Sequence, residues 1–357
     1  AGDLSSGTLY AGVLRETDIS KRSVGGSFNI SFTRLGHATS AQVEELAEDY
    51  FSLGGQSGAW QSIFEKVFKD FKYSPDSIYT TAITSANGAK VYIKPTDAAE
   101  TNFSAYTLIN YGKSQELIKV KSGAEIGAAF LETERYASYL GATMEFTKFE
   151  GVTINRRDKK AYLAISAIKS TMNDNTSYKP EANNSIMLSI LNSGATYEVD
   201  LGSDHTIGSD WVPQFMSAPS MLLGSDLVTS DSHGNTANLD SIANTDNIWF
   251  SESMRTLFVG EDSNMHINNY VWAYNVDNAS LARIFSAPAG AECSGLKAID
   301  NLNGFAYLLL NFQHPGDWEN IHSSILSSTD LNTQINENWA NKTTAALGYM
   351  ILPAVGS

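Results

Sequence analysis

The feature that most constrains the fold is a short unit that occurs three times in the second half of the chain. In each copy an acidic residue opens a strand-like run, a polar turn follows, and a strongly apolar run closes the unit. The three acids are Glu150, Asp246 and Glu292, and the apolar runs that follow them cover 161–166, 256–260 and 305–312. Alternating runs joined by short polar turns predict consecutive antiparallel β-strands. The acid therefore holds the same place in three similar β-units.

The spacing of the acids favours a β-propeller. Asp246 and Glu292 lie 46 positions apart, which is close to the length of one four-stranded blade, about 40–50 residues. If each acid opens a blade, the acids occupy equivalent positions around one central axis. We therefore expect an all-β propeller whose three carboxylates converge at one mouth of the channel.

Two blades can be counted in full. The first is predicted to hold strands at 151–155, 161–166, 185–191 and 195–201, and the second begins at Asp246 and ends near Phe285. The segment 261–269 within the second blade is dense in oxygen and nitrogen ligands. Glu292 heads a third unit, which a run at 347–352 is expected to close. Propellers need about four to eight blades, so residues 1–357 are expected to form a single propeller domain or the C-terminal part of one.

Other segments depart from this pattern. Helical insertions are predicted around 40–72 and 125–140, with Ser40 as the first N-cap and a phenylalanine stripe at 60–71 packed on a core. The whole of 40–110 is expected to be a helical excursion. Residues 202–245, rich in Ser, Asp, Gly, Asn and Thr, are expected to form a long polar insertion. Within it, 230–235 is either an ordinary polar turn or a cation site.

The net charge of the chain limits the kinds of partner that it is expected to bind. The chain carries 39 Asp plus Glu against 24 Lys plus Arg, a formal net charge of −15, which disfavours nucleic acid and anionic membranes and suits bound cations, or simply solubility. No apolar run of about 18 residues is present to span a bilayer. The chain opens without a basic and apolar leader, so any export signal is expected to have been removed or to lie outside this sequence.

Cysteine usage excludes two further classes of site. Cys293 is the only cysteine, which rules out an internal disulfide framework and a cysteine-rich zinc site. Because side chains alternate along a strand, Cys293 is expected to point away from Glu292, into the core. His314, before a proline, is expected to stabilise a turn rather than act as a base.

Five motifs together resemble the PhoX-type alkaline phosphatases, which are calcium- and iron-dependent secreted enzymes with a six-bladed β-propeller. The matching segments are 7–10, 150–152, 246–250, 287–292 and 312–316, in the order and spacing of that family. The resemblance runs from about residue 3 to residue 319 and is weakest over 40–110. It implies calcium and iron as cofactors, a phosphate ester as substrate, and a periplasmic or extracellular location.

The resemblance also implies roles for single residues. In the family, acids at these strand starts bind a central metal cluster, and an arginine two positions before the first acid grips phosphate. Carried over, Glu150, Asp246 and Glu292 are implied metal ligands, and Lys148 takes the place of the arginine beside Glu150 in catalysis. Lysine keeps the charge but loses the bidentate fork. A cysteine and further glutamate ligands of the family lie upstream of the 7–10 motif, so a separate N-terminal portion is expected to supply them.

Three functions remain open at this point. The first is hydrolysis of phosphate monoesters, in which clustered cations neutralise the phosphate and activate water. The second is a non-catalytic binding module, favoured by Lys148, by its neighbour Phe149 and by the missing upstream ligands. The third is another calcium-dependent propeller hydrolase, such as a phosphodiesterase, phytase or lactonase, because one frame carries many chemistries. Each acid, taken alone, is also compatible with a solvated strand end.

Overall fold

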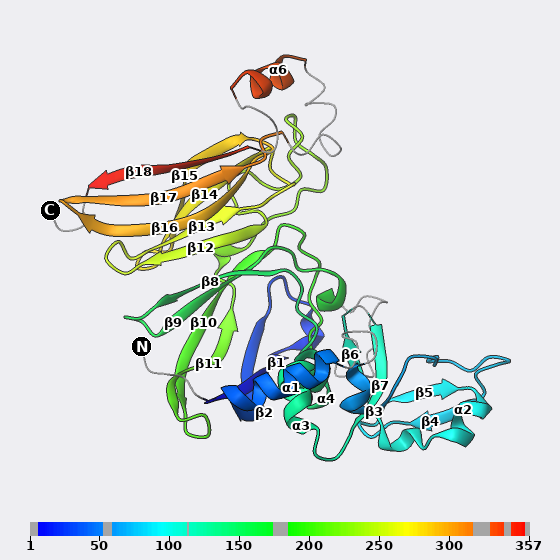
Figure 1. Cartoon of the computed structure of the whole chain (residues 1–357). Coiled ribbons are helices and arrows are strands. Elements are labelled where there is room, and N and C mark those ends of the chain that lie inside the picture. Colours follow the sequence, from blue (N-terminus) through cyan, green and yellow to red (C-terminus); the bar gives the residue numbers. More distant parts are fainter. Residues whose placement is uncertain are drawn as a thin grey trace. The chain divides into compact units, whose positions relative to one another are not determined.

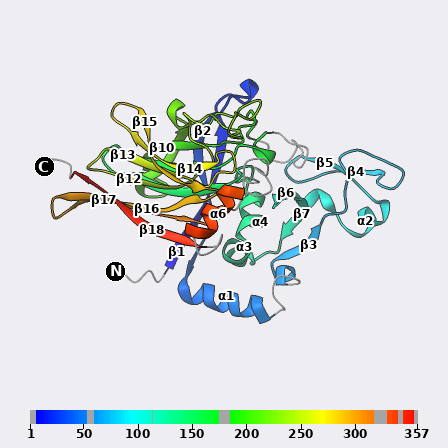
Figure 2. The same ribbon diagram turned by 90° about the horizontal axis from the view of Figure 1, so that it is seen from above.

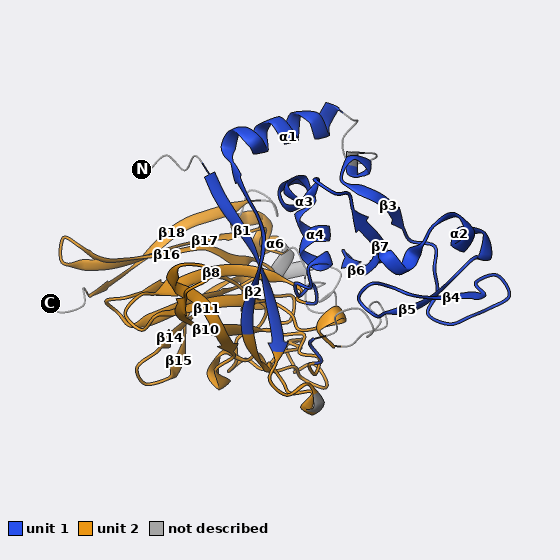
Figure 3. Cartoon of the chain, turned by 90° about the horizontal axis from the view of Figure 1, so that it is seen from below, with its two compact units in different colours: residues 1–15, 30–145, 174–187 blue, residues 16–29, 146–173, 188–357 orange. Residues whose placement is uncertain are grey.

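The computed structural model describes residues 6–52, 59–112, 114–173, 185–316, 329–338 and 344–353 (Figure 1). The chain forms two compact units (Figure 3). Unit 1 comprises 1–15, 30–145 and 174–187, and unit 2 comprises 16–29, 146–173 and 188–357. Strand makes up 48% and helix 18% of the structure, so the fold is mostly β, as expected. No closed propeller is formed by the described residues.

Unit 2 contains three antiparallel sheets built from consecutive strands. The first has β8 (Phe149–Asn155), β9 (Lys160–Ile165), β10 (Ala195–Asp204) and β11 (Ser209–Ser217). The strand order continues through β2 (Ser27–Thr39) to β1 (Ser6–Glu16), most of which belong to unit 1. The second has β12 (Thr245–Ser251), β13 (Thr256–Glu261), β14 (Asn268–Asn275) and β15 (Ser280–Ala289). The third has β16 (Glu292–Leu302), β17 (Phe305–Gln313) and β18 (Ala345–Pro353).

The three sheets pack through apolar faces. Tyr162 of the first sheet stacks on Phe250 of the second, with ring centroids 5.8 Å apart, within a core that also holds buried Val259 and Trp272. A second core joins the second sheet to the third and includes Cys293. Cys293 is fully buried, which confirms the prediction that it is a packing residue.

Two glycines, Gly151 of β8 and Gly260 of β13, allow strands of neighbouring sheets to approach closely. A Cβ added at Gly151 of β8 would lie 2.5 Å from the carbonyl oxygen of Asp246 in β12. A Cβ at Gly260 would lie 2.8 Å from the carbonyl oxygen of Cys293 in β16. Carbon and oxygen cannot pack this closely, so no other residue fits at these two positions without moving a strand.

Unit 1 is smaller and mixed. Its strands are β3 (Phe64–Phe68), β4 (Thr81–Thr84), β5 (Lys90–Ile93), β6 (Thr107–Tyr111) and β7 (Ser114–Val120), arranged as a β3-β7-β6 sheet and a β4-β5 hairpin. Its helices are α1 (Ser40–Ser52), α2 (Pro95–Glu100), α3 (Glu125–Leu131) and α4 (Thr133–Tyr139). A further helix, α6 (Thr329–Asn338), belongs to unit 2. None of the described helices has both the length and the apolar character needed to cross a bilayer.

The predicted helical insertions are confirmed only in part. Helix α1 forms as expected, although Thr39 rather than Ser40 caps it through reciprocal hydrogen bonds with Gln42. The segment 125–140 forms two short helices, α3 and α4, rather than one. The predicted helix at 60–71 is wrong, because β3 occupies its centre. Buried Phe64 and Phe68 are four residues apart, as on one face of a helix, but the β3–β7 pairing shifts register between Phe64 and Val67. The two rings consequently pack in different hydrophobic clusters. With β3 to β6 inside it, 40–110 is not a helical excursion.

The first sheet also differs from the prediction at two places. Residues 185–191 form no strand, and β10 pairs directly with β9. The fourth strand is β11, which lies inside the segment expected to be a polar insertion, 202–245. Its apolar Val212 and Met216 are buried, but Pro213 and a serine-rich surrounding hide the alternation. The strands of the second sheet and the closing strand β18 form as predicted.

Candidate functional site

Each acid-headed strand in unit 2 begins with the same backbone geometry. A residue with positive φ lies two positions before each acid. These residues are Lys148 (φ 55°), Asn244 (φ 46°) and Gly290 (φ 78°). A left-handed residue redirects the chain sharply, and it costs of order 1–3 kcal/mol when the residue is not glycine. Because the same turn precedes Glu150, Asp246 and Glu292, these acids hold equivalent places in their sheets.

Electrostatic interactions link the three carboxylates through Asp246. Burial, followed by the charges of Glu150 and Asp262, raises the pKa of Asp246 to about 6. Burial, followed by Asp262 and more weakly by Asp246, raises the pKa of Glu292 to about 7. Asp262 is thus the neighbouring acid with the largest effect on the pKa of Glu292, and Asp246 interacts with Glu150 and with Glu292.

Asp262 is a fourth acid, which the sequence did not single out. It is the first residue after β13, the second strand of its sheet. His314 is the first residue after β17 and holds the same place in the third sheet. The signal was present in the sequence as a polar residue directly after each apolar second run, within the segment 261–269 that is dense in ligands.

Basic and amide groups flank the acids. The Lys148 Nζ lies 3.0 Å from Glu150 Oε1, and this hydrogen bond is the main cause that raises the Lys148 pKa. The His314 Nε2 lies 3.5 Å from Glu292 Oε2, and Gln313 donates a hydrogen bond to the other oxygen of Glu292. His314 also occupies a turn, with φ 43° and its backbone N–H donated to Thr344. Glu292 is thus oriented from two sides.

A buried polar network fixes the backbone next to Asp262. Its neighbour Glu261 is fully buried. The carboxylate of Glu261 accepts hydrogen bonds from the Trp272 indole at 2.7 Å and from the backbone N–H groups of Ala243 and Tyr270, and it lies 3.0 Å from His266 Nδ1. The Asp262 N–H donates to the Asn244 carbonyl oxygen. Networks with every member satisfied hold their backbone rigidly, so the position of Asp262 is preorganised.

The side chains of this set are of the type that a hard cation prefers, but their arrangement is not that of a metal site. Lys148 pairs with Glu150 and His314 with Glu292, and burial, followed by the charges of neighbouring acids, raises the pKa values of Asp246 and Glu292. Oxygen-rich, anionic sites of this kind are those that calcium prefers. Among the described residues, however, no group of three or more His, Cys, Asp or Glu side chains is placed so that it could hold a metal ion.

The raised pKa values predict how stability depends on pH. A carboxyl whose folded pKa lies above its unfolded value stabilises the fold at low pH, and this contribution is lost as pH rises through the folded pKa. We expect the thermal midpoint of the metal-free protein, measured in EDTA, to fall by a few degrees between pH 5.5 and pH 8. The Asp262→Asn variant should show a smaller fall, because one repelling charge is gone. An equal or higher midpoint at pH 8 would contradict the proximity of these acids.

The second candidate cation segment, 230–235, forms an ordinary polar turn. The Asp231 carboxylate accepts hydrogen bonds from the backbone N–H groups of His233 at 2.8 Å and Asn235 at 2.9 Å, and from the Asn235 side chain. These N–H donors occupy the oxygens that a cation would need. The structure therefore favours the polar-turn interpretation.

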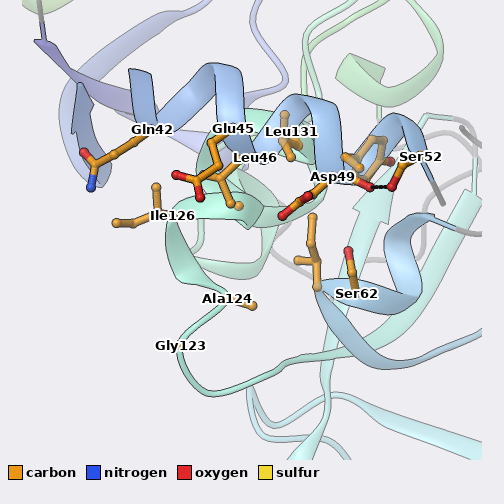
Figure 4. Close-up of a pocket in the computed structure, with 13 residues that line it drawn as sticks. Gln42, Glu45, Leu46, Asp49, Ser52, Ser62, Gly123, Ala124, Ile126 and Leu131 are labelled. Carbon is orange, nitrogen blue, oxygen red and sulfur yellow. Dashed lines mark hydrogen bonds between the residues drawn. The ribbon is translucent and has the colours of Figure 1, made fainter. Parts of the chain in front are cut away.

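A pocket of about 620 Å³ lies in unit 1, away from these acids in the sequence (Figure 4). Glu45 and Asp49 project from α1 on one wall, and Ile126 lies on the wall formed by α3. None of the residues that line this pocket belongs to the five sequence motifs. The candidate site therefore remains the acidic set of unit 2.

Comparison of the chain with protein-family models, with curated proteins and with solved structures found no match. The functional interpretation consequently depends on the geometry of Glu150, Asp246, Asp262 and Glu292 and on the sequence motifs around them. We use the term acidic site for these four residues together with Lys148 and His314.

Proposed function

We propose that this protein is a metal-dependent phosphatase that hydrolyses phosphate monoesters at the acidic site. The observation that carries the proposal is that Glu150, Asp246 and Glu292, from three separate sheets, each follow a left-handed residue two positions earlier. The charge of Glu150 also raises the pKa of Asp246, and that of Asp246 raises the pKa of Glu292. A phosphate ester is strongly anionic, so carboxylates reach it only through bound cations. The motif resemblance to the PhoX-type enzymes supports calcium and iron as those cations, and a periplasmic or extracellular location.

We further propose that the three sheets of unit 2 are successive blades of a β-propeller. The first strands β8, β12 and β16 are neighbours, and β12 contacts both of the others. Gly151 and Gly260 support this arrangement, because they permit the backbone contacts between consecutive sheets. Closure of a ring needs more blades than three, and the proposal assigns them to a separate N-terminal portion of the protein.

Each residue of the acidic site has a role in this proposal. Glu150, Asp246 and Glu292 hold the cations, and Asp262 contributes a fourth carboxylate. When bound, the metal ions would neutralise the phosphate, activate a water molecule and stabilise the leaving alkoxide. Lys148, a mobile point charge 3.0 Å from Glu150, attracts the phosphate but directs it less strictly than an arginine would. Gln313 and His314 keep Glu292 oriented.

A second candidate is a non-catalytic binding module. It is favoured by one observation, that no closed metal-holding group exists among the described residues. Another calcium-dependent propeller hydrolase, acting on a diester, phytate or a lactone, is the third.

An assay with two substrates distinguishes these functions. The protein, together with any upstream portion, is incubated with calcium and iron and either p-nitrophenyl phosphate or bis-p-nitrophenyl phosphate. We expect turnover of the monoester that stops when the metals are chelated and returns when they are restored. Turnover of the diester alone would favour a different hydrolase, and no turnover of either ester would favour the binding module.

A further inference from the structure

In the part of the chain that the structure describes, the third sheet has three strands, one fewer than the second sheet. A fourth strand, β11 or β15, pairs with the third strand of the first and second sheets. In the third sheet β18 pairs with β17 along nine residues. No strand in the described parts of the chain pairs with its other side. Figure 1 and Figure 2 show β18, in red, beside β17.

This edge strand is strongly exposed and apolar. Leu347, Tyr349 and Ile351 are 82%, 64% and 55% exposed. In β14, the third strand of the second sheet, Val271 and Trp272 are 0% and 2% exposed. The three exposed side chains alternate with half-buried ones, so they lie on one uncovered face of the third sheet. A long, uncharged edge presents a row of backbone N–H and C=O groups that readily pair with another strand.

The sequence of β18 is complementary to itself. Its nine residues carry no charge, although the chain has a formal net charge of −15, so two copies of this strand can approach without like charges meeting. In antiparallel pairing centred on Tyr349, Leu347 of one copy lies opposite Ile351 of the other. Large apolar residues opposite each other are favourable cross-strand pairs, each contributing roughly 0.2–1 kcal/mol. A contact that uses the same patch on both copies closes as a two-fold dimer.

We propose that β18 pairs antiparallel with β18 of a second copy of this chain, so that the third sheet continues across a two-fold axis. Tyr307, whose ring centroid lies 5.8 Å from that of Tyr349, extends the shared apolar face. The proposal is independent of the phosphatase activity, because β17 separates β18 from the acid-bearing strand β16.

The mass of the protein in solution tests the proposal. Multi-angle light scattering is expected to give a dimer, twice the 38.7 kDa of one chain. Leu347→Lys should give the monomer, because a lysine on the edge strand would meet an apolar side chain of the other copy. Val228→Lys, at a fully exposed position outside the strands, should remain dimeric. A monomeric wild-type protein at micromolar concentration would overturn the proposal.

Cross-linking tests the register and does not depend on the folding of a charged variant. Tyr349 would face its own counterpart with Cα atoms about 4.5–5.5 Å apart, within the range that a disulfide spans. Tyr349→Cys should therefore oxidise to a covalent dimer, while the buried Cys293 does not react. Val228→Cys serves as the control. If the two variants cross-link equally well, the proposed pairing is wrong.

Discussion

The Glu292→Gln variant is expected to lose phosphatase activity by at least a hundredfold and to bind less metal, while its fold is retained. Glu292 is 14% exposed, faces Asp262, and is oriented by Gln313 and His314. Glutamine has nearly the same shape, so it preserves the packing but removes the negative charge that holds a cation. Plasma emission spectrometry measures the bound calcium and iron, and circular dichroism checks the fold.

The matched control for this variant is Asp240→Asn. Asp240 also loses one negative charge, but its side chain is 90% exposed and its nearest charged partner, Arg283, lies 3.8 Å away. Activity and metal content should stay at the wild-type level. If Glu292→Gln binds as much metal as the control does, Glu292 is not a ligand.

The Gly151→Val variant is expected to lose stability by about 2–3 kcal/mol and to lose the activity with it. The added side chain would begin 2.5 Å from the Asp246 carbonyl oxygen and 3.0 Å from the Ile248 nitrogen. These are backbone atoms, so β8 and β12 must separate, and overpacking of this kind costs typically 1–3 kcal/mol. Separation would also move Glu150 away from Asp246. Thermal unfolding and the monoester assay measure the two effects.

Gly7→Val is the control for steric bulk. A Cβ at Gly7 meets nothing within 4 Å, so stability and activity should change little. Equal losses in both variants would mean that the effect comes from β-branching or from the loss of glycine in general, and not from the contact between β8 and β12.

The sequence predicted the acid-bearing strands well because their pattern is local. Each strand of the second sheet is a short alternating run with a polar turn at its end, and neighbouring strands pair with each other. The place of Glu150, Asp246 and Glu292 in that pattern was therefore readable, and so was the burial of Cys293 beside Glu292. The prediction needed no knowledge of distant contacts.

Long-range pairing accounts for most of what was missed. Strand β3 pairs with β7, about fifty residues later in the chain, and its phenylalanines fit a helix equally well until that partner is known. Strand β11 carries a proline, Pro213, at a register shift of its pairing with β10, and it pairs with β2, from the start of the chain, only over 215–217. Neither pairing can be read from the local sequence. Asp262 could not be identified from the sequence, because its importance depends on its interaction with Glu292, which lies in another sheet.

The central claim is that carboxylates from three sheets hold cations together. Calorimetric titration of calcium into the metal-free wild type, into Glu150→Gln, into Glu292→Gln and into the double variant tests it most directly. We expect each single variant to weaken calcium binding at least tenfold and the double variant to lose little more than either one, since the two residues act on the same ions. The account is contradicted if the losses of calcium affinity in the two single variants simply add in the double variant. It is also contradicted if neither substitution changes calcium binding.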